Sequence, residues 1–228
     1  MCVHGVAVDP HEELERQAGH LVSLGYPALA GTSNRSFRSR VERLHPLLDA
    51  AGVPRSVSRT RWPLFALVIP GVPPEDAMPL TRQGAETGYV DMRPVEPSDF
   101  CPLESAIPSG PYLVAGVETG GDTLGIAPRD ALPLVAARGR SPLTIAEGIA
   151  VITAFPGILR EANCFQMAGS RRNDKRIPSL WVTRAGAPRL GWCFEGVPHS
   201  WLGTASCSGR MGTPAPAGGK AATAHAAR

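Results

Sequence analysis

Side chains that can do chemistry gather towards the end of the chain, between residues 163 and 207. This stretch holds three of the five cysteines, three of the four tryptophans and one histidine. Three thiolates and an imidazole suit tetrahedral zinc, and the candidate ligands are Cys164, Cys193, His199 and Cys207. Structural zinc sites usually contain a closely spaced Cys-x₂₋₄-Cys pair, which these residues lack. We therefore expect no metal and keep a structural zinc protein as an alternative.

Cys193 and His199 also have the residue types of a nucleophile and its general base. Glu195 or Asp174 would orient the imidazole, and Trp201 would line the pocket. A nucleophilic cysteine normally lies at a helix N-terminus or beside a cation, because both lower the pKa of the thiol. Cys193 instead lies in an expected strand. A small-molecule enzyme with a Cys193/His199/Trp201 pocket is therefore an alternative to our first interpretation, a non-enzymatic binding or regulatory module.

The loop between residues 169 and 176 is rich in hydrogen-bond donors. Guanidinium groups bind phosphate and carboxylate in a forked geometry, and nearby aromatic rings offer stacking faces. These features predict a surface for an anionic partner, either nucleic acid or an acidic protein. Its candidate residues are Arg171, Arg172, Asn173, Lys175, Arg176, Trp192, His199 and Trp201. The alternative is a solvated loop that binds nothing specific, with the tryptophan rings in the core.

Two helices are expected at the start of the chain. Asp9 caps the first one, Pro10 occupies its first position and Gly25 ends it. The second helix extends from about residue 33 to residue 48, with apolar positions along one face. Its other face carries Arg35, Arg38, Arg40 and Arg43. The two helices predict an antiparallel hairpin within residues 9–52.

The rest of the chain alternates between strand-like and helix-like patterns. Strands are expected at 64–69, 88–92, 112–117, 164–168, 179–183 and 189–194, and a helix at 127–138. Thr144 and Glu147 form a capping box that starts another helix, which Pro156 ends. Gly186 lies in the turn between the last two strands. We therefore expect an α+β fold, with helices packed on a small mixed or antiparallel sheet and an N-terminal helical hairpin.

Charge is unevenly distributed, although the formal net charge is only +3. Residues 33–61 carry a net charge of +5, residues 62–134 carry −7 and residues 165–228 carry +7. Such asymmetry makes a basic patch or a surface dipole if the segments stay apart. If oppositely charged segments pack on one another, their charges cancel.

A single domain is expected at residues 9–210, between a flexible N-terminus at 1–8 and a disordered tail at 211–228. The first residues lack the pattern of a signal peptide, and no apolar run is long enough to span a bilayer. We therefore expect a soluble cytoplasmic protein with no membrane contact. The odd number of cysteines argues against a disulfide framework, and the lack of a nucleotide-binding glycine motif leads us to expect no cofactor.

The order of several short motifs is similar to that of a known family. These are LGYP at 24–27, GDTL at 121–124, RGRSPLTIAEG at 138–148, NCF at 163–165, GSR at 169–171, RIPSLWV at 176–182, PRLGWC at 188–193 and HSWLG at 199–203. The chain resembles the actinobacterial DUF5701 family, over nearly all its length except the tail. The resemblance implies no activity, so no functional residue is carried over from it.

Overall fold

The structure is a computed structural model that describes residues 7–51, 57–58, 65–103 and 107–212. Its α-helices are α1 (Pro10–Ser23), α2 (Tyr26–Leu29), α3 (Asn34–Glu42), α4 (His45–Ala50), α5 (Pro74–Ala77), α6 (Pro128–Ala137) and α7 (Ile145–Ala154). Four 3₁₀ turns add η1 (Met78–Leu80), η2 (Pro97–Asp99), η3 (Gly121–Thr123) and η4 (Pro156–Ile158). Within these described ranges, no helix has the length and apolar character needed to cross a membrane.

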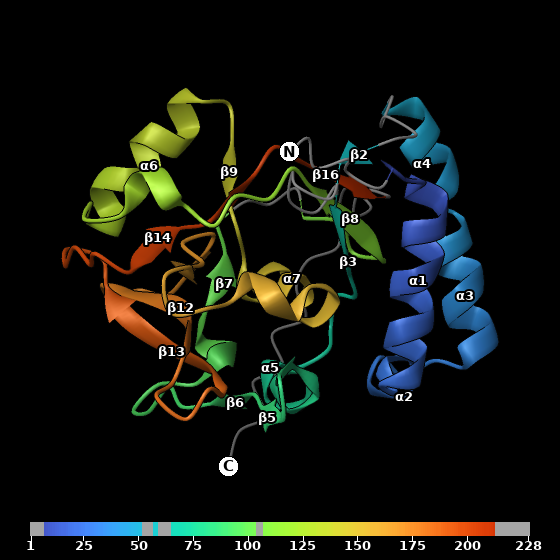
Figure 1. Cartoon of the computed structure of the whole chain (residues 1–228), viewed down its shortest axis with the longest axis horizontal. Coiled ribbons are helices and arrows are strands. Elements are labelled where there is room, and N and C mark those ends of the chain that lie inside the picture. Colours follow the sequence, from blue (N-terminus) through green and yellow to red (C-terminus); the bar gives the residue numbers. More distant parts are fainter. Residues whose placement is uncertain (1–6, 52–56, 59–64, 104–106, 213–228) are drawn as a thin grey trace, which may run out of the picture.

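The strands form several sheets, so the expected α+β class is confirmed (Figure 1). They are β1 (Ala7–Val8), β2 (Val57–Ser58), β3 (Phe65–Val68), β4 (Arg82–Gln83), β5 (Glu86–Thr87), β6 (Tyr89–Val90), β7 (Cys101–Pro102), β8 (Tyr112–Ala115), β9 (Ser141–Pro142), β10 (Cys164–Gln166), β11 (Ser170–Arg171), β12 (Arg176–Val182), β13 (Pro188–Phe194), β14 (Leu202–Thr204), β15 (Ser206–Cys207) and β16 (Gly209–Gly212).

The largest sheet has five strands in the order β14-β10-β12-β13-β6. It is mixed: β12 is antiparallel to both β10 and β13, whereas β14 and β6 add to its edges in parallel. The β12–β13 hairpin is its longest ladder, and Gly186 adopts a φ of 91° in the connecting turn. This conformation favours glycine, so the predicted hairpin and its turn are both confirmed.

Helix α7 lies between this sheet and a three-stranded sheet of order β16-β8-β3 (Figure 1). Eight of its ten residues are buried, as expected for a helix that is apolar all round. Gly148 lets the helix approach the five-stranded sheet, because a Cβ there would meet the side chains of Met167 and Leu180. The predicted capping box is present: Thr144 Oγ1 accepts from Glu147 N, and Glu147 Oε2 accepts from Thr144 N.

Glu147 also belongs to a buried ionic cluster. Its carboxylate pairs with the guanidinium group of Arg210 in β16 and accepts a hydrogen bond of 2.9 Å from the Tyr112 hydroxyl in β8. The Glu147 side chain is 0% exposed and the Arg210 side chain 8%. Burial and the adjacent Glu147 charge raise the pKa of Tyr112. The cluster thus fixes α7 to the three-stranded sheet.

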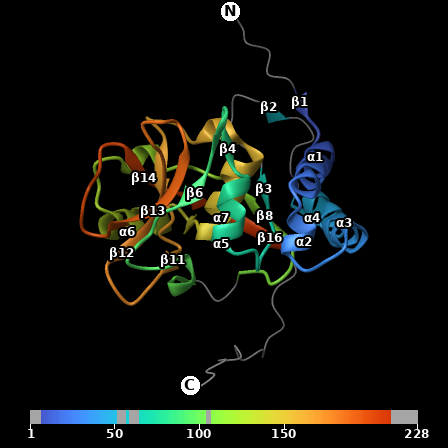
Figure 2. The same ribbon diagram turned by 90° about the horizontal axis from the view of Figure 1, so that it is seen from below.

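Helices α1–α4 form a lobe at one side of the molecule, and α6 lies at the opposite end (Figures 1 and 2). The lobe attaches to the edge strand β3 through Gln17 of α1. Its amide donates to Phe65 O at 3.1 Å and accepts from Leu67 N at 2.7 Å. The Gln17 amide therefore forms the two hydrogen bonds that a neighbouring strand would form with Phe65 O and Leu67 N. These backbone groups at the edge of the sheet are then not left unpaired.

The lobe differs from the expected two-helix hairpin. The single helix expected at 33–48 is divided into α3 and α4. Pro46 explains the break, because proline has no N–H to donate to the previous turn and its ring disfavours a continuous helix. The first helix is as expected, with Asp9 accepting from His11 N and Pro10 at the start.

The predicted boundaries of the terminal segments were wrong by two residues at each end. Ala7 and Val8 lie in β1, which pairs with β2, instead of belonging to a flexible N-terminus. Met211 and Gly212 lie in β16, which pairs with β8, instead of starting a disordered tail. Short strands with distant partners leave no local signal in the sequence. The remaining parts of these two predictions, at 1–6 and 213–228, lie outside the described residues.

Candidate functional site

The basic loop expected at 169–176 is shorter in the structure. Ser170 and Arg171 form β11, which pairs with β7 of a distant segment, and Arg176 is the first residue of β12. Only residues 172–175 turn between the two strands. The pairing of Ser170 with Pro102 and of Arg171 with Cys101 spans about seventy positions of the chain, so the local pattern could not predict it.

Two of the loop arginines are paired with acids from other segments. Arg171 forms an ion pair with Glu195, which lies just after β13. Arg172 pairs with Asp99 of η2 at 2.6 Å. Both guanidinium groups are half-buried, with 21% and 30% of the side chain exposed. These charges are therefore largely compensated within the protein.

Asp174 neutralises the remaining arginine of the loop. It pairs with Arg176 and also lies 2.9 Å from Arg172 Nε. Desolvation opposes ionisation of Asp174, but hydrogen bonds from the Arg176 backbone and guanidinium group, with the nearby charges, hold its pKa below the usual range. Asn173 and Lys175 remain exposed. The loop thus presents less free positive charge than its sequence suggests.

The aromatic candidates lie on two faces of the β12–β13 hairpin. Trp192 pairs in register with Pro178, whereas Trp181 pairs with Arg189. Side chains alternate between the two faces of a strand, so Trp192 and Trp181 point to opposite sides. Trp192 Nε1 donates to Met92 O at 2.8 Å, and the Arg176 guanidinium group lies 4.4 Å from its ring. This tryptophan is half-buried and held in place by those contacts.

On the other face, Trp181, Arg189, His199 and Trp201 form what we call the ring cluster. Trp181 and Trp201 meet edge to face with centroids 6.3 Å apart, and His199 meets Trp201 at 5.4 Å. The Arg189 guanidinium group lies 4.9 Å from the Trp181 ring and pairs with Asp91 at 2.8 Å. The structure therefore brings His199 and Trp201 together and separates them from Trp192.

The ring cluster continues into an exposed segment at residues 194–201, whose first residue, Phe194, lies on the other face of the hairpin and meets Trp192 with ring centroids 5.0 Å apart. Phe194, Val197 and Trp201 are 46%, 43% and 40% exposed. The backbone of this segment is anchored at both ends, since Arg129 N donates to the carbonyl of Glu195 and Gly125 N to that of His199. Burial lowers the pKa of His199, which favours a neutral imidazole beside the tryptophan.

The cysteines are placed unfavourably for thiolate chemistry. Burial raises the pKa of Cys193, against a hydrogen bond from Ser179 that lowers it. Burial likewise raises the pKa of Cys164, whose Sγ donates to Arg160 O. Among the described residues, no contact joins Cys193 to His199. Both thiols are therefore expected to remain protonated at neutral pH.

The four candidate zinc ligands are not gathered at one point. Cys164 and Cys193 belong to the five-stranded sheet, whereas Cys207 is buried in β15, which pairs with β9. His199 contacts Trp201. In the part of the chain that the structure describes, no group of three or more His, Cys, Asp or Glu side chains is arranged to hold a metal ion.

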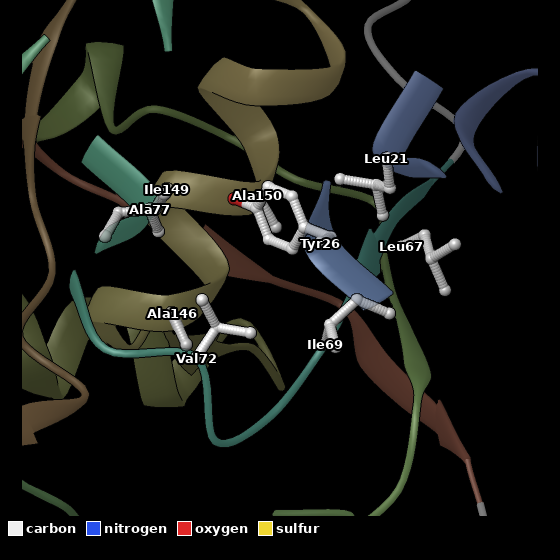
Figure 3. Close-up of a pocket in the computed structure, with 9 residues that line it drawn as sticks. All are labelled: Leu21, Tyr26, Leu67, Ile69, Val72, Ala77, Ala146, Ile149 and Ala150. Atoms are coloured by element: carbon white, nitrogen blue, oxygen red, sulfur yellow. The ribbon is translucent and has the colours of Figure 1, made fainter. Parts of the chain in front are cut away.

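An apolar hollow lies between the helical lobe and the rest of the protein (Figure 3). Leu21 and Tyr26 line it from the lobe, and Ile149 and Ala150 line it from α7. Its volume is about 310 Å³ with its open mouth included. Burial raises the pKa of Tyr26, against a hydrogen bond with Thr153. The Tyr26 hydroxyl is the one polar side-chain group among the residues that line the hollow. We interpret the hollow as a gap in the packing between the lobe and α7, because its lining has no set of reactive groups.

A family model described as a family of unknown function, DUF5701, matches residues 20–213. The chain belongs to the DUF5701 family. Comparison with curated proteins and with solved structures found no match. The matched region of this DUF5701 protein includes α3, the buried ionic cluster, the basic loop and the ring cluster.

Sequence reasoning overlooked Arg189 and the exposed part of the 194–201 segment. A signal for Arg189 was present, because counting outward from the Gly186 turn pairs Trp181 with Arg189 across the hairpin. The exposure of Phe194 and Val197 had no such signal. Apolar residues after a strand indicate burial more often than exposure, and only the course of the chain shows which applies.

Proposed function

We propose that this DUF5701 protein is a non-enzymatic binding module that docks a partner protein on the surface formed by the ring cluster and residues 197–201. The exposure of Trp201 carries the proposal. A tryptophan that is 40% exposed and held by rings on its flanks offers a large contact area at a small cost in side-chain entropy. Tryptophan is enriched among the few residues that supply most of the binding energy of protein interfaces.

The surroundings of Trp201 fit this role. Val197 adds exposed apolar area in the same segment, and interfaces have an apolar centre with a polar rim. Phe194 lies outside this surface, because its ring meets that of Trp192 on the other face of the hairpin. Lys175 accepts the hydrogen bond of Glu195 N through its carbonyl group, so the exposed turn of the basic loop borders the segment. We place Asn173 and Lys175 on the rim, where they would meet acidic groups of the partner.

The alternative functions have less support. An enzyme with a Cys193/His199/Trp201 pocket needs a reactive thiolate, and burial raises the pKa of Cys193. A zinc protein needs converging ligands, and Cys164, Cys193, His199 and Cys207 are spread over separate elements. We place the binding module in the cytoplasm of an actinobacterium, where reducing conditions keep cysteines as thiols.

The test compares Trp201→Ala with Leu134→Ala, which removes an apolar side chain of similar exposure, 43%, on α6. A partner is isolated with the tagged full-length protein, identified, purified and titrated against both variants. We expect Trp201→Ala to weaken binding at least roughly tenfold, as for an interface anchor, and Leu134→Ala to leave it unchanged. Equal affinity of wild type and a folded Trp201→Ala variant overturns the proposal.

A further inference from the structure

Helix α3 presents a dense group of arginines that the rest of the protein does not neutralise. Arg35, Arg38, Arg40 and Arg43 are all exposed, and Arg43 is the C-cap residue of the helix. Over the described ranges, none of these four side chains takes part in an ion pair or hydrogen bond. The arginines of the 169–176 loop, by contrast, are paired with acids.

The apolar side of α3 is already used within the lobe. Phe37 and Val41 are each 1% exposed and belong to the core. The helix lies at the outer edge of the molecule in both views, so its charged face is turned away from the body (Figures 1 and 2). Ser39 is also exposed among the arginines. Glu42 is exposed on the same face, four residues after Arg38. The face therefore combines four cations with one carboxylate and a hydroxyl group, and it lacks large apolar side chains.

We propose that the outer face of α3 binds the phosphate backbone of nucleic acid. Guanidinium groups pair with phosphate oxygens in a forked geometry, and serine hydroxyls are common additional donors. Arg35 and Arg38 are three residues apart, so they project from adjacent positions on the helix and contact neighbouring phosphates. The surface is separate from the ring cluster and does not depend on the function proposed for it.

The same features disfavour other anionic partners. A helix that binds a membrane surface inserts its apolar side, and in α3 that side is buried. An acidic protein partner needs an apolar interface centre, which the exposed face of α3 does not provide. A polyphosphate backbone needs only cations and hydrogen-bond donors, because release of counterions drives the binding.

The experiment uses the full-length protein and a fluorescein-labelled 20-base-pair DNA duplex of arbitrary sequence. Binding is followed by anisotropy at several salt concentrations. The variant Arg35→Gln/Arg38→Gln is compared with Arg160→Gln/Arg184→Gln, which removes two exposed arginines elsewhere. We expect the α3 variant to reduce the slope of log K against log salt by about 2, one for each lost phosphate contact, and the control variant to retain the slope.

Three outcomes overturn the proposal. If both double variants reduce the slope of log K against log salt equally, the binding depends on net charge rather than on α3. Displacement of the DNA by poly-glutamate at equal charge concentration reassigns the face to acidic proteins. Binding to phosphatidylserine vesicles that depends on Arg35 and Arg38, without DNA binding, reassigns it to membranes. Equal thermal unfolding temperatures of all variants ensure that folded proteins are compared.

A different observation concerns His11 of α1 and His45 of α4, which meet head to head. Their Nδ1 atoms are 2.7 Å apart, and the nearly parallel rings have centroids 5.0 Å apart. The distance between the ring centroids is about the distance between the two Nδ1 atoms plus the distance from each Nδ1 atom to the centroid of its own ring. Both Nδ1 atoms therefore lie on the line between the ring centres and point at each other in the ring planes.

The protons on these rings can be counted from their partners. His11 Nε2 lies 3.2 Å from Asp49 Oδ1, and His45 Nε2 lies 3.0 Å from Glu15 Oε1. Carboxylates accept hydrogen bonds, so each Nε2 carries a proton. Two neutral rings would then oppose their Nδ1 lone pairs at 2.7 Å, and two fully protonated rings would oppose two N–H groups. With a single proton between them, one Nδ1 atom donates to the other, and each Nε2 still donates to its carboxylate.

We infer that the pair holds one shared proton, which joins α1 to α4. Of the charged groups that the structure describes, Glu15 from α1 and Asp49 from α4 contact the rings, and Asp9 binds the His11 backbone. The link between the two helices therefore depends on this one proton.

Nitrogen-15 NMR of the full-length protein at neutral pH tests this inference, together with thermal unfolding at the same pH. We expect protons on both Nε2 atoms and one between the Nδ1 atoms. His45→Gln should lower the unfolding temperature, and the control His20→Gln should leave it unchanged. A proton on each Nδ1 atom, or on neither, overturns the inference. So does stabilisation of the wild type alone by equimolar zinc, which would identify a metal ion in place of the proton.

Discussion

Single residues explain why the ring cluster is rigid enough to act as an anchor. Trp181 lies across Gly191, at a position where a Cβ atom would meet its Cη2 atom at 2.2 Å. The glycine thus provides the space in which the ring rests, and Arg189 packs against the ring. Trp201 in turn meets the edge of Trp181. The position of the exposed tryptophan therefore depends on the absence of a side chain in β13.

The variant Gly191→Ala should displace the Trp181 ring and lower the free energy of unfolding by about 1–3 kcal/mol, the usual cost of overpacking. Urea denaturation measures the loss, and near-ultraviolet circular dichroism reports the tryptophan environment. Gly209→Ala is the matched control, because this strand glycine has nothing within 4 Å of a Cβ atom. Identical effects of the two substitutions would contradict the role assigned to Gly191.

Among the elements, those fixed by nearby residues could be predicted from the sequence. The capping box of α7 joins residues three positions apart, and the β12–β13 hairpin turns at Gly186. The long-range ion pairs of the basic loop could not be predicted, because Asp99 is 73 positions from Arg172. The contact between His11 and His45 likewise depends on how two helices pack, 34 positions apart.

The capping box makes an element-scale prediction. Thr144→Ala should lower the free energy of unfolding by about 1 kcal/mol, because Glu147 N loses its side-chain acceptor. Thr144→Ser retains the hydroxyl group and should restore most of the stability. Chemical denaturation of the three proteins provides the comparison. If serine and alanine destabilise equally, the methyl group of Thr144 matters and its hydroxyl group does not.

Across the whole molecule, packing cancels part of the charge asymmetry of the sequence. Acids from the negative segment pair with arginines of the positive C-terminal segment, as in Asp91 with Arg189 and Asp99 with Arg172. The arginines of α3 are outside this pairing. The distribution explains why the basic surface expected at residues 169–176 is weakened, while a basic surface remains on the lobe.

The buried ionic cluster connects the central helix to the three-stranded sheet, and it predicts strong coupling between distant parts of the chain. Arg210→Met leaves the Glu147 carboxylate in a site where it is 0% exposed. Removing one partner of such a pair typically costs about 3–5 kcal/mol, because the remaining charge stays buried without compensation.

The double variant Glu147→Gln/Arg210→Met removes both charges, and the amide that replaces the carboxylate still offers an acceptor to Tyr112. We therefore expect it to be more stable than Arg210→Met alone, as measured by urea denaturation in a double-mutant cycle. Additive losses would mean that the two side chains stabilise the fold independently, and that the ion pair does not couple α7 to β16.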